Sequence, residues 1–165
     1  MKSIKFILLF LLNLLIDLTV LSKFNIGGYI PSMTLPLIIV MSIYNKNEKI
    51  VYYSIIQGLF QDVIFGGILG LKALYFYLIA YYTFKFDYKK NYNLIYANAA
   101  LIISIIFKNI LMLFRNFYYL NLGVKVLLID TVSKTFYEII ISAIILVFIY
   151  FIGQIIQKAN SKNYI

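Results

Sequence analysis

Residues 50–82 read IVYYSIIQGLFQDVIFGGILGLKALYFYLIAYY, and this stretch decides the predicted fold. Within it, Gly58, Asp62, Gly66 and Gly70 recur at every fourth position. Residues four apart lie on one face of an α-helix, so the spacing predicts a stripe of three glycines and one carboxylate. Glycines at this spacing let a second backbone approach closely, and an acid in apolar surroundings is expected to face protein or water instead of lipid.

The stripe has two interpretations. In the first, the glycines form a seam for helix packing and a neighbouring group satisfies Asp62. In the second, Asp62 belongs to an ion or ligand site. We favour the first, because packing glycines are common in membrane helices and no second acidic residue lies near Asp62 in the sequence to form a metal or proton-relay site.

The composition indicates the class of protein. The chain has 165 residues, of which 63% are hydrophobic, whereas about half are apolar in an ordinary soluble domain. We therefore predict a single transmembrane domain over residues 1–165 and no sizeable soluble domain. Lys2 and Lys5 precede the first apolar run as in a signal peptide, but no small-residue cleavage site follows, which predicts an uncleaved first helix.

The residue types exclude several kinds of chemistry. Without cysteine or histidine, the chain cannot form disulfides or zinc–thiolate sites, nor use a cysteine nucleophile or a histidine base. It also lacks a glycine-rich phosphate loop and a nucleophile elbow, so we expect no enzymatic activity, no metal and no cofactor. A net charge of +9 would suggest nucleic acid binding in a soluble protein, but here the lysines flank apolar runs and indicate membrane orientation.

The apolar runs predict an all-α integral membrane protein with about six transmembrane helices in one bundle. As one helix, residues 50–82 would extend roughly 50 Å, well beyond the ~30 Å apolar core of a bilayer, so this stretch must turn back near 70–72. The fourth span is short enough for a re-entrant segment. The predicted spans are approximately 4–21, 29–44, 50–69, 71–84, 94–114 and 135–156.

Prolines and semi-apolar sequence mark two irregular segments. Pro36 lies inside the second apolar run, where it predicts either a kink or a late start of the helix. Residues 115–134 form the longest predicted connector, and residues 120–130 within it are expected to lie along the membrane interface as a short helix.

Polar residues inside the spans are candidates for interhelical contacts. Asn13 and Asp17 share one face of the first span, and Asp17 is a candidate buried charge. Gln57 and Gln61 are expected to make interhelical hydrogen bonds. Lys108 and Glu138 are expected to snorkel or to lie near an interface, with an Asp–Lys pair between helices as the alternative.

The positive charges predict the orientation. With six spans, both termini lie on one side of the membrane together with the 45–49 and 85–93 loops. Nine of the fifteen Lys and Arg residues fall on that side, five fall on the other, and Lys108 is inside a span. Because cytoplasmic loops carry the excess of Lys and Arg, both termini are expected in the cytoplasm.

The order of these features resembles the rod shape-determining protein MreD family. The proline-containing run PSMTLPLIIV (31–40) precedes a polar turn, and QGLFQDVIFGGILGLKALYFYLIAYY (57–82) follows with its Gly-x-x-x-Asp and Gly-x-x-x-Gly core. The matching motif covers about a third of the chain, while the remainder agrees in hydropathy alone. The positions that the resemblance marks are Pro36, Gly58, Asp62, Gly66 and Gly70.

The resemblance implies a non-enzymatic component of the bacterial cell-elongation machinery in the inner membrane. Its implied partners are an MreC-like protein, the MreB filament, and the peptidoglycan synthases RodA and penicillin-binding protein. Apart from the resemblance, membrane lipid is an expected partner, and a homo-oligomer is left open. The family is also similar in architecture to the six-helix substrate-binding subunits of energy-coupling-factor vitamin transporters. A vitamin-type transporter subunit is therefore the alternative function, although the first span lacks the Ala-x-x-x-Ala seam that such subunits use for docking.

Overall fold

The computed structural model describes residues 2–24, 30–45, 48–65, 68–85, 93–119 and 124–162. These ranges hold six α-helices and a short 3-10 helix, η1, and no strand occurs within them. The elements are α1 (Lys2–Thr19), η1 (Leu21–Lys23), α2 (Thr34–Asn45), α3 (Lys49–Phe65), α4 (Leu71–Lys85), α5 (Asn93–Tyr119) and α6 (Val124–Lys162).

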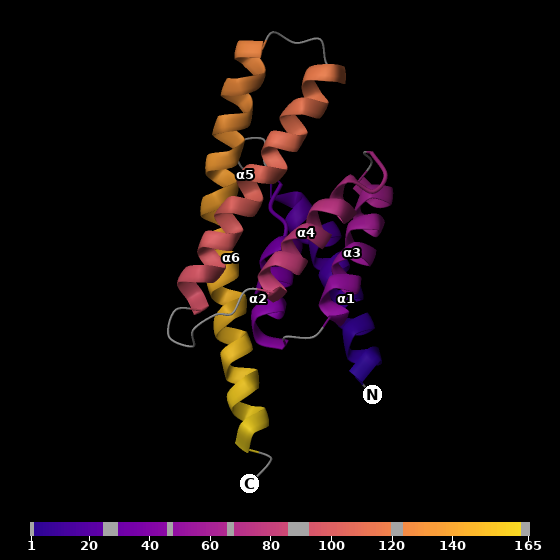
Figure 1. Ribbon diagram of the computed structural model, residues 1–165, viewed down its shortest axis with the longest axis vertical. Coiled ribbons are helices and arrows are strands. Elements are labelled where there is room, and N and C mark those ends of the chain that lie inside the picture. Colours follow the sequence, from indigo (N-terminus) through magenta and orange to yellow (C-terminus); the bar gives the residue numbers. More distant parts are fainter. Residues whose placement is uncertain are drawn as a thin grey trace.

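Successive helices run in alternating directions along the long axis of the molecule (Figure 1). Both termini lie toward one end, where α2 leads to α3 and α4 leads to α5 (Figure 1). The opposite end holds the passages from α1 to α2, from α3 to α4 and from α5 to α6. We call these the terminal end and the far end.

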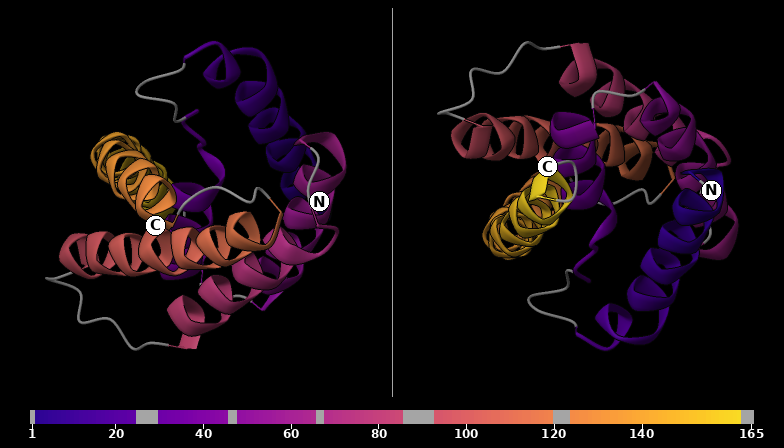
Figure 2. Two further views of the ribbon diagram at one scale, coloured as in Figure 1. Left: turned by 90° about the horizontal axis from the view of Figure 1, so that it is seen from above. Right: turned by 90° about the horizontal axis from the view of Figure 1, so that it is seen from below.

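Helix α2 forms the centre of the bundle and contacts each of the other five α-helices (Figure 2). It is apolar on nearly all sides, as expected for a helix that other helices surround. Ile38 and Ile39 are fully buried in its middle. The core therefore consists of α2 and the inward faces of its neighbours.

The start of α2 resolves the ambiguity at Pro36. The helix begins at Thr34, so Pro36 lies in its first turn, where the missing N–H leaves no intrahelical hydrogen bond unmade. The Leu37 N–H donates to the Met33 carbonyl at 3.0 Å and closes that turn. Pro36 thus marks a late start, and the helix is shorter than the predicted 29–44 segment.

Helices α3 and α4 form a hairpin with a turn earlier than expected. Helix α3 ends at Phe65, not at residue 69, and α4 begins at Leu71. Gly70 has φ +90°, a left-handed conformation that favours glycine, and it therefore belongs to the turn. The four-residue stripe consequently does not continue along one helix, and Gly66 lies outside the described residues.

Helices α5 and α6 form a hairpin, and each of them is longer than any other helix of the described part. Helices of 27 and 39 residues extend about 40 Å and about 58 Å, and both project beyond their neighbours at the far end (Figure 1). The prediction of a short interfacial helix in the 115–134 connector is wrong, because α6 begins at Val124 and continues without a break. Residues 124–134 contain no proline or glycine to stop the helix, and Lys134 pairs with Asp130 at 2.7 Å one turn away.

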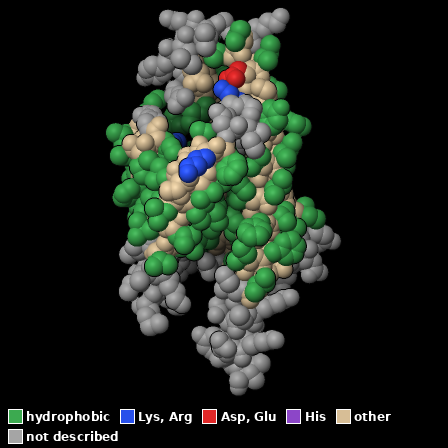
Figure 3. Space-filling view, turned by 180° about the vertical axis from the view of Figure 1, so that it is seen from behind, with side chains coloured by type: hydrophobic (Ala, Val, Ile, Leu, Met, Phe, Trp, Pro, Cys, Tyr) green, Lys and Arg blue, Asp and Glu red, His purple; other side chains and the backbone are tan. Residues whose placement is uncertain are grey.

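The outer surface of the described part is largely apolar. Large hydrophobic side chains are exposed on every α-helix with described side chains except α2, and Figure 3 shows them covering most of one face. Two stretches, Leu94–Phe114 in α5 and Val126–Ile155 in α6, are long and apolar enough to cross a membrane, among the residues that the structure describes. Exposed apolar patches of this extent mark a surface that contacts lipid or other proteins.

Candidate functional site

The carboxylate of Asp62 closes the turn between α3 and α4. Its Oδ2 atom accepts hydrogen bonds from the backbone N–H groups of Gly70, at 2.9 Å, and Lys72, at 3.1 Å. These groups lie at the start of α4, where the first N–H groups have no intrahelical acceptor. Asp62 therefore acts as a cap for the next helix in the chain, and its negative charge also suits the positive end of the α4 dipole.

One turn before Asp62, the backbones of α3 and α4 are in contact at Gly58. A Cβ atom on Gly58 would lie 2.3 Å from the Cα atom and 2.5 Å from the N atom of Ala73. Real Cβ atoms do not approach backbone atoms so closely, so this crossing requires glycine. By contrast, a Cβ atom on Gly70 would meet no atom within 4 Å.

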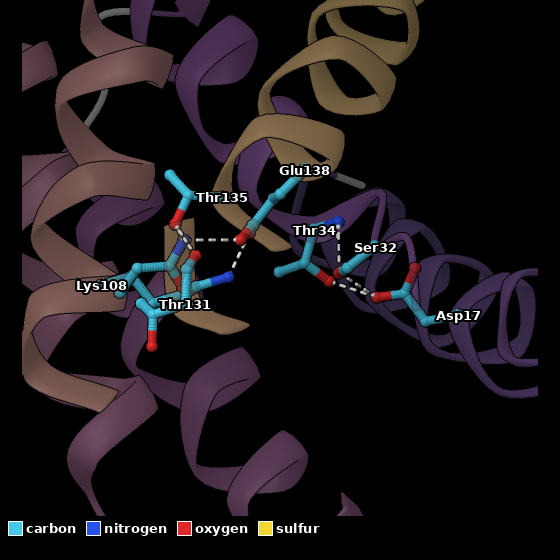
Figure 4. A network of polar contacts seen from close by, with 8 residues as sticks. Asp17, Ser32, Thr34, Lys108, Thr131, Thr135 and Glu138 are labelled. Atoms are coloured by element: carbon cyan, nitrogen blue, oxygen red, sulfur yellow. Dashed lines mark hydrogen bonds and ion pairs between the residues drawn. The ribbon is translucent and has the colours of Figure 1, made fainter. Parts of the chain in front are cut away.

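A second polar cluster joins α1, α2 and α3 around the buried carboxylate of Asp17. Asp17 lies opposite the N-terminus of α2, so it caps this helix across the interface with α1. Its hydrogen bonds satisfy a backbone donor and a side-chain donor at the start of α2. Its donors are the Ser32 hydroxyl at 2.9 Å, the Met33 N–H at 2.9 Å, the Thr34 hydroxyl at 2.6 Å and the Gln61 amide at 3.0 Å. Figure 4 shows the Ser32 and Thr34 hydroxyl groups beside Asp17.

The hydroxyl of Thr34 is the centre of this cluster. Its oxygen accepts from the side-chain amides of Asn13 at 2.8 Å, Gln61 at 2.7 Å and Gln57 at 3.3 Å. The interhelical hydrogen bonds expected of the two glutamines are thus confirmed. Three buried polar atoms nearby have no hydrogen-bond partner among the residues that the structure describes, namely Asn13 Oδ1, Gln57 Oε1 and the Tyr53 hydroxyl. The cluster therefore retains two acceptors and one hydroxyl that its own residues do not satisfy.

A third cluster connects α5 to α6 nearer the far end. Lys108 forms an ion pair with Glu138, and their side chains are only 16% and 7% exposed. The Asn109 amide donates to Glu138 Oε2 and to the Thr135 hydroxyl, both at 3.0 Å. Figure 4 shows Lys108, Thr135 and Glu138 together in this cluster. The expectation that Lys108 and Glu138 snorkel is therefore wrong, because each charge is neutralised inside the bundle by the other. The alternative of an Asp–Lys pair is also wrong, since the partner of Lys108 is a glutamate.

Family comparison covers nearly the whole chain. A model of the family described as rod shape-determining protein MreD matches residues 2–159. The chain belongs to the MreD family. Membership implies a membrane protein with a role in the determination of rod shape. No curated protein and no solved structure matches the chain.

The structure brings most of the predicted MreD-family positions together in the α3–α4 hairpin. Gly58 provides the close backbone contact, Asp62 caps α4, and Gly70 forms the turn. Pro36 lies apart from them, in the first turn of α2, where it is fully buried. Gly66 lies outside the described residues.

Two residues of the Asp17 cluster in this MreD-family chain, Ser32 and Thr34, were not predicted from the sequence. A signal was available, because Ser and Thr favour helix N-termini and Pro favours the first turn. The segment PSMTLP (31–36) carries both features. This signal does not identify the group that Ser32 and Thr34 bind, since no pattern in residues 31–36 points to a carboxylate on the preceding helix.

Proposed function

We propose that this chain is a multi-pass protein of the bacterial inner membrane and a non-enzymatic scaffold of the rod-shape machinery. The observation that carries the proposal is the MreD family match over residues 2–159. We propose that all six α-helices cross the membrane in one bundle, with the terminal end in the cytoplasm. The alternating helices and the excess of Lys and Arg at the terminal end support this orientation.

The short central helix is compatible with this arrangement. Twelve residues of α2 extend about 18 Å, less than the ~30 Å apolar core, so the chain before Thr34 also lies at membrane depth. Non-helical backbone is tolerated there only where protein satisfies its polar groups. The Asp17 carboxylate does this for the Met33 N–H, and the surrounding helices separate α2 from lipid.

We further propose that the projecting part of the α5–α6 hairpin is the contact surface for an extracytoplasmic MreC-like partner. Large apolar side chains there, including Phe117, Ile129 and Val132, are exposed and are not part of the core of the bundle. Apolar residues exposed beyond a bundle are typical of a protein–protein interface. The MreB filament, RodA and a penicillin-binding protein would belong to the same assembly, with or without direct contact.

Photo-crosslinking from two positions on the same helix tests this surface. Val132 and Ile155 are 67% and 68% exposed on α6, at the far end and toward the terminal end respectively. A photoactivatable residue at Val132 should trap an MreC-like protein in native membranes, and one at Ile155 should not. Traps from Ile155 but not from Val132 would contradict the assignment.

The vitamin-transporter alternative is favoured by one observation. The Asp17 cluster is buried and polar, and it retains unsatisfied acceptors on Asn13 and Gln57, as a site for a polar ligand would. Purification of the tagged full chain from native membranes separates the two functions. An MreC-like protein in the eluate supports the scaffold, and a stoichiometric ATPase module supports the transporter subunit.

A further inference from the structure

An apolar groove of about 410 Å³ lies between α4 and α5. It follows the C-terminal half of α4 and the N-terminal half of α5, so it lies toward the terminal end (Figure 1). Small side chains on α5 leave the space, because Ala99 and Ala100 stand where larger residues would fill it. The lining also includes Leu78, Thr83, Ser104 and Phe107.

The two hydroxyl groups on Thr83 and Ser104 do not make the groove polar. Thr83 donates to the Ile79 carbonyl of its own helix at 2.6 Å, and Ser104 donates to the Ala100 carbonyl at 2.6 Å. Both hydroxyl protons are therefore used within the helices. The groove suits a hydrocarbon group and offers little to a polar ligand such as a vitamin.

The size of the groove restricts its occupant. An α-helix with its side chains is about 10–12 Å across, and a stable protein interface buries about 1,200 Å² or more in total. A groove of about 410 Å³ is in the range of small-molecule sites, too small to be the whole seat of a partner helix or of a second copy. A single hydrocarbon chain is the apolar group of this size that a membrane supplies.

Charge at the end of the groove indicates the rest of the ligand. Tyr82 and Tyr96 line the groove, and α4 ends two residues after Thr83 with Lys85. The Lys85 side chain is exposed, with its ammonium 4.9 Å from the centre of the Tyr81 ring. A cation flanked by tyrosines is typical of the level of lipid headgroups.

We propose that this groove binds one acyl chain of an anionic phospholipid from the cytoplasmic leaflet, with its phosphate beside Lys85. The assignment to the cytoplasmic leaflet rests on the proposed function, which places the terminal end of the bundle in the cytoplasm. The apolar groove holds the acyl chain, and Lys85 selects for net negative charge in the headgroup.

Photo-labelling by lipids tests the site on the full chain in vesicles of phosphatidylethanolamine. The probe is phosphatidylglycerol with a photoactivatable group in one acyl chain. Label should concentrate on residues 78–83 and 96–107, and unlabelled phosphatidylglycerol should compete about fivefold better than phosphatidylethanolamine. Even labelling of all lipid-facing helices, or equal competition by the two lipids, would overturn the proposal.

Two pairs of variants distinguish binding of the acyl chain in the groove from recognition of the headgroup charge by Lys85. Ala99→Phe fills the groove and should lower labelling about tenfold, whereas Ile110→Phe, at an exposed position of α5 outside the groove, should not. Lys85→Gln should remove the preference for phosphatidylglycerol, whereas Lys23→Gln near the far end should keep it. Unchanged labelling with Ala99→Phe, in a protein that melts like the wild type, would exclude the groove as the site.

One further outcome would refute the lipid as occupant. A photoactivatable residue at Ile103, which lines the groove, should react with lipid in native membranes. Efficient crosslinks from Ile103 to a protein, whether a partner or a second copy, would show a protein interface instead. Lipid labelling is measured on purified protein, whereas rod shape is measured in cells. A failure of the lipid proposal is therefore distinguishable from a failure of the proposed function.

Discussion

Substitution of Gly58 by alanine tests the close crossing of α3 and α4. The added Cβ atom would lie 2.3 Å from the Ala73 Cα atom and 2.5 Å from its N atom. Both are backbone atoms, so no side-chain rotation relieves the contact. The two helices must separate by about 1 Å to reach an ordinary van der Waals distance of about 3.5 Å.

The magnitude follows from two opposing effects. Inserting a group into a packed interface costs about 1–3 kcal/mol, and contact with backbone corresponds to the upper end of that range. Alanine in a helix is more favourable than glycine by about 1 kcal/mol. The net loss for Gly58→Ala is therefore about 2 kcal/mol, which lowers the Tm of a domain of this size by about 4–8 °C. Movement of the start of α4 would also lengthen the hydrogen bonds that Asp62 accepts.

The assay is thermal unfolding of the full chain in detergent, combined with its abundance in membranes. Gly153→Ala is the matched control, because its Cβ atom would lie 3.1 Å from a ring atom of Tyr44, a side chain that can move. We expect a clear loss of Tm for Gly58→Ala and a smaller change for Gly153→Ala. Equal Tm and abundance for Gly58→Ala and the wild type would refute the backbone contact.

Three further substitutions test the polar clusters. Asp62→Asn keeps an acceptor for the Gly70 and Lys72 N–H groups and should lower the free energy of unfolding by less than about 1 kcal/mol, whereas Asp62→Ala should lower it by about 1–2 kcal/mol. Normal abundance with loss of rod shape for Asp62→Asn would instead indicate an ion site. Asp17→Ala leaves four donors without their acceptor and should lower stability by at least about 3 kcal/mol, measured as Tm, and a neutral effect would exclude a structural role. Glu138→Gln removes the charge opposite Lys108 and should cost about 3–5 kcal/mol, while Glu138→Leu combined with Lys108→Met should cost much less than the two single changes together; additive losses in this double-mutant cycle would contradict the ion pair.

Local sequence determined much of the architecture, because the features concerned act over short distances. The apolar excess dictates helices, since lipid offers no hydrogen bonds to the backbone. Pro36 places the start of α2 within one turn, because a proline is accommodated only near a helix N-terminus. The hairpin between α3 and α4 was also predictable, because one helix over residues 50–82 would exceed the bilayer. The resemblance of residues 31–40 and 57–82 to the MreD family was confirmed over residues 2–159.

The end of a helix was less predictable than its presence. Nothing in the spacing of Gly58, Asp62, Gly66 and Gly70 separates a stripe on one helix from a helix followed by a turn, since glycine is compatible with both. The continuity of α6 through residues 124–134 was missed for a related reason, because semi-apolar sequence suits an interfacial helix and the end of a longer one equally well.

Only the tertiary structure decided which polar groups meet. Lys108 and Glu138 are 30 residues apart, and their pairing depends on the rotation and vertical register of α5 against α6. Asp17 reaches the start of α2 only because α1 packs beside it, and Gln61 arrives from a third helix 44 residues further along the chain. Periodicity determines which side of one helix a residue occupies, but the relative position of two helices results from side-chain packing along their whole contact. The same packing leaves the groove between α4 and α5, since its two walls come from two helices and neither helix forms it alone.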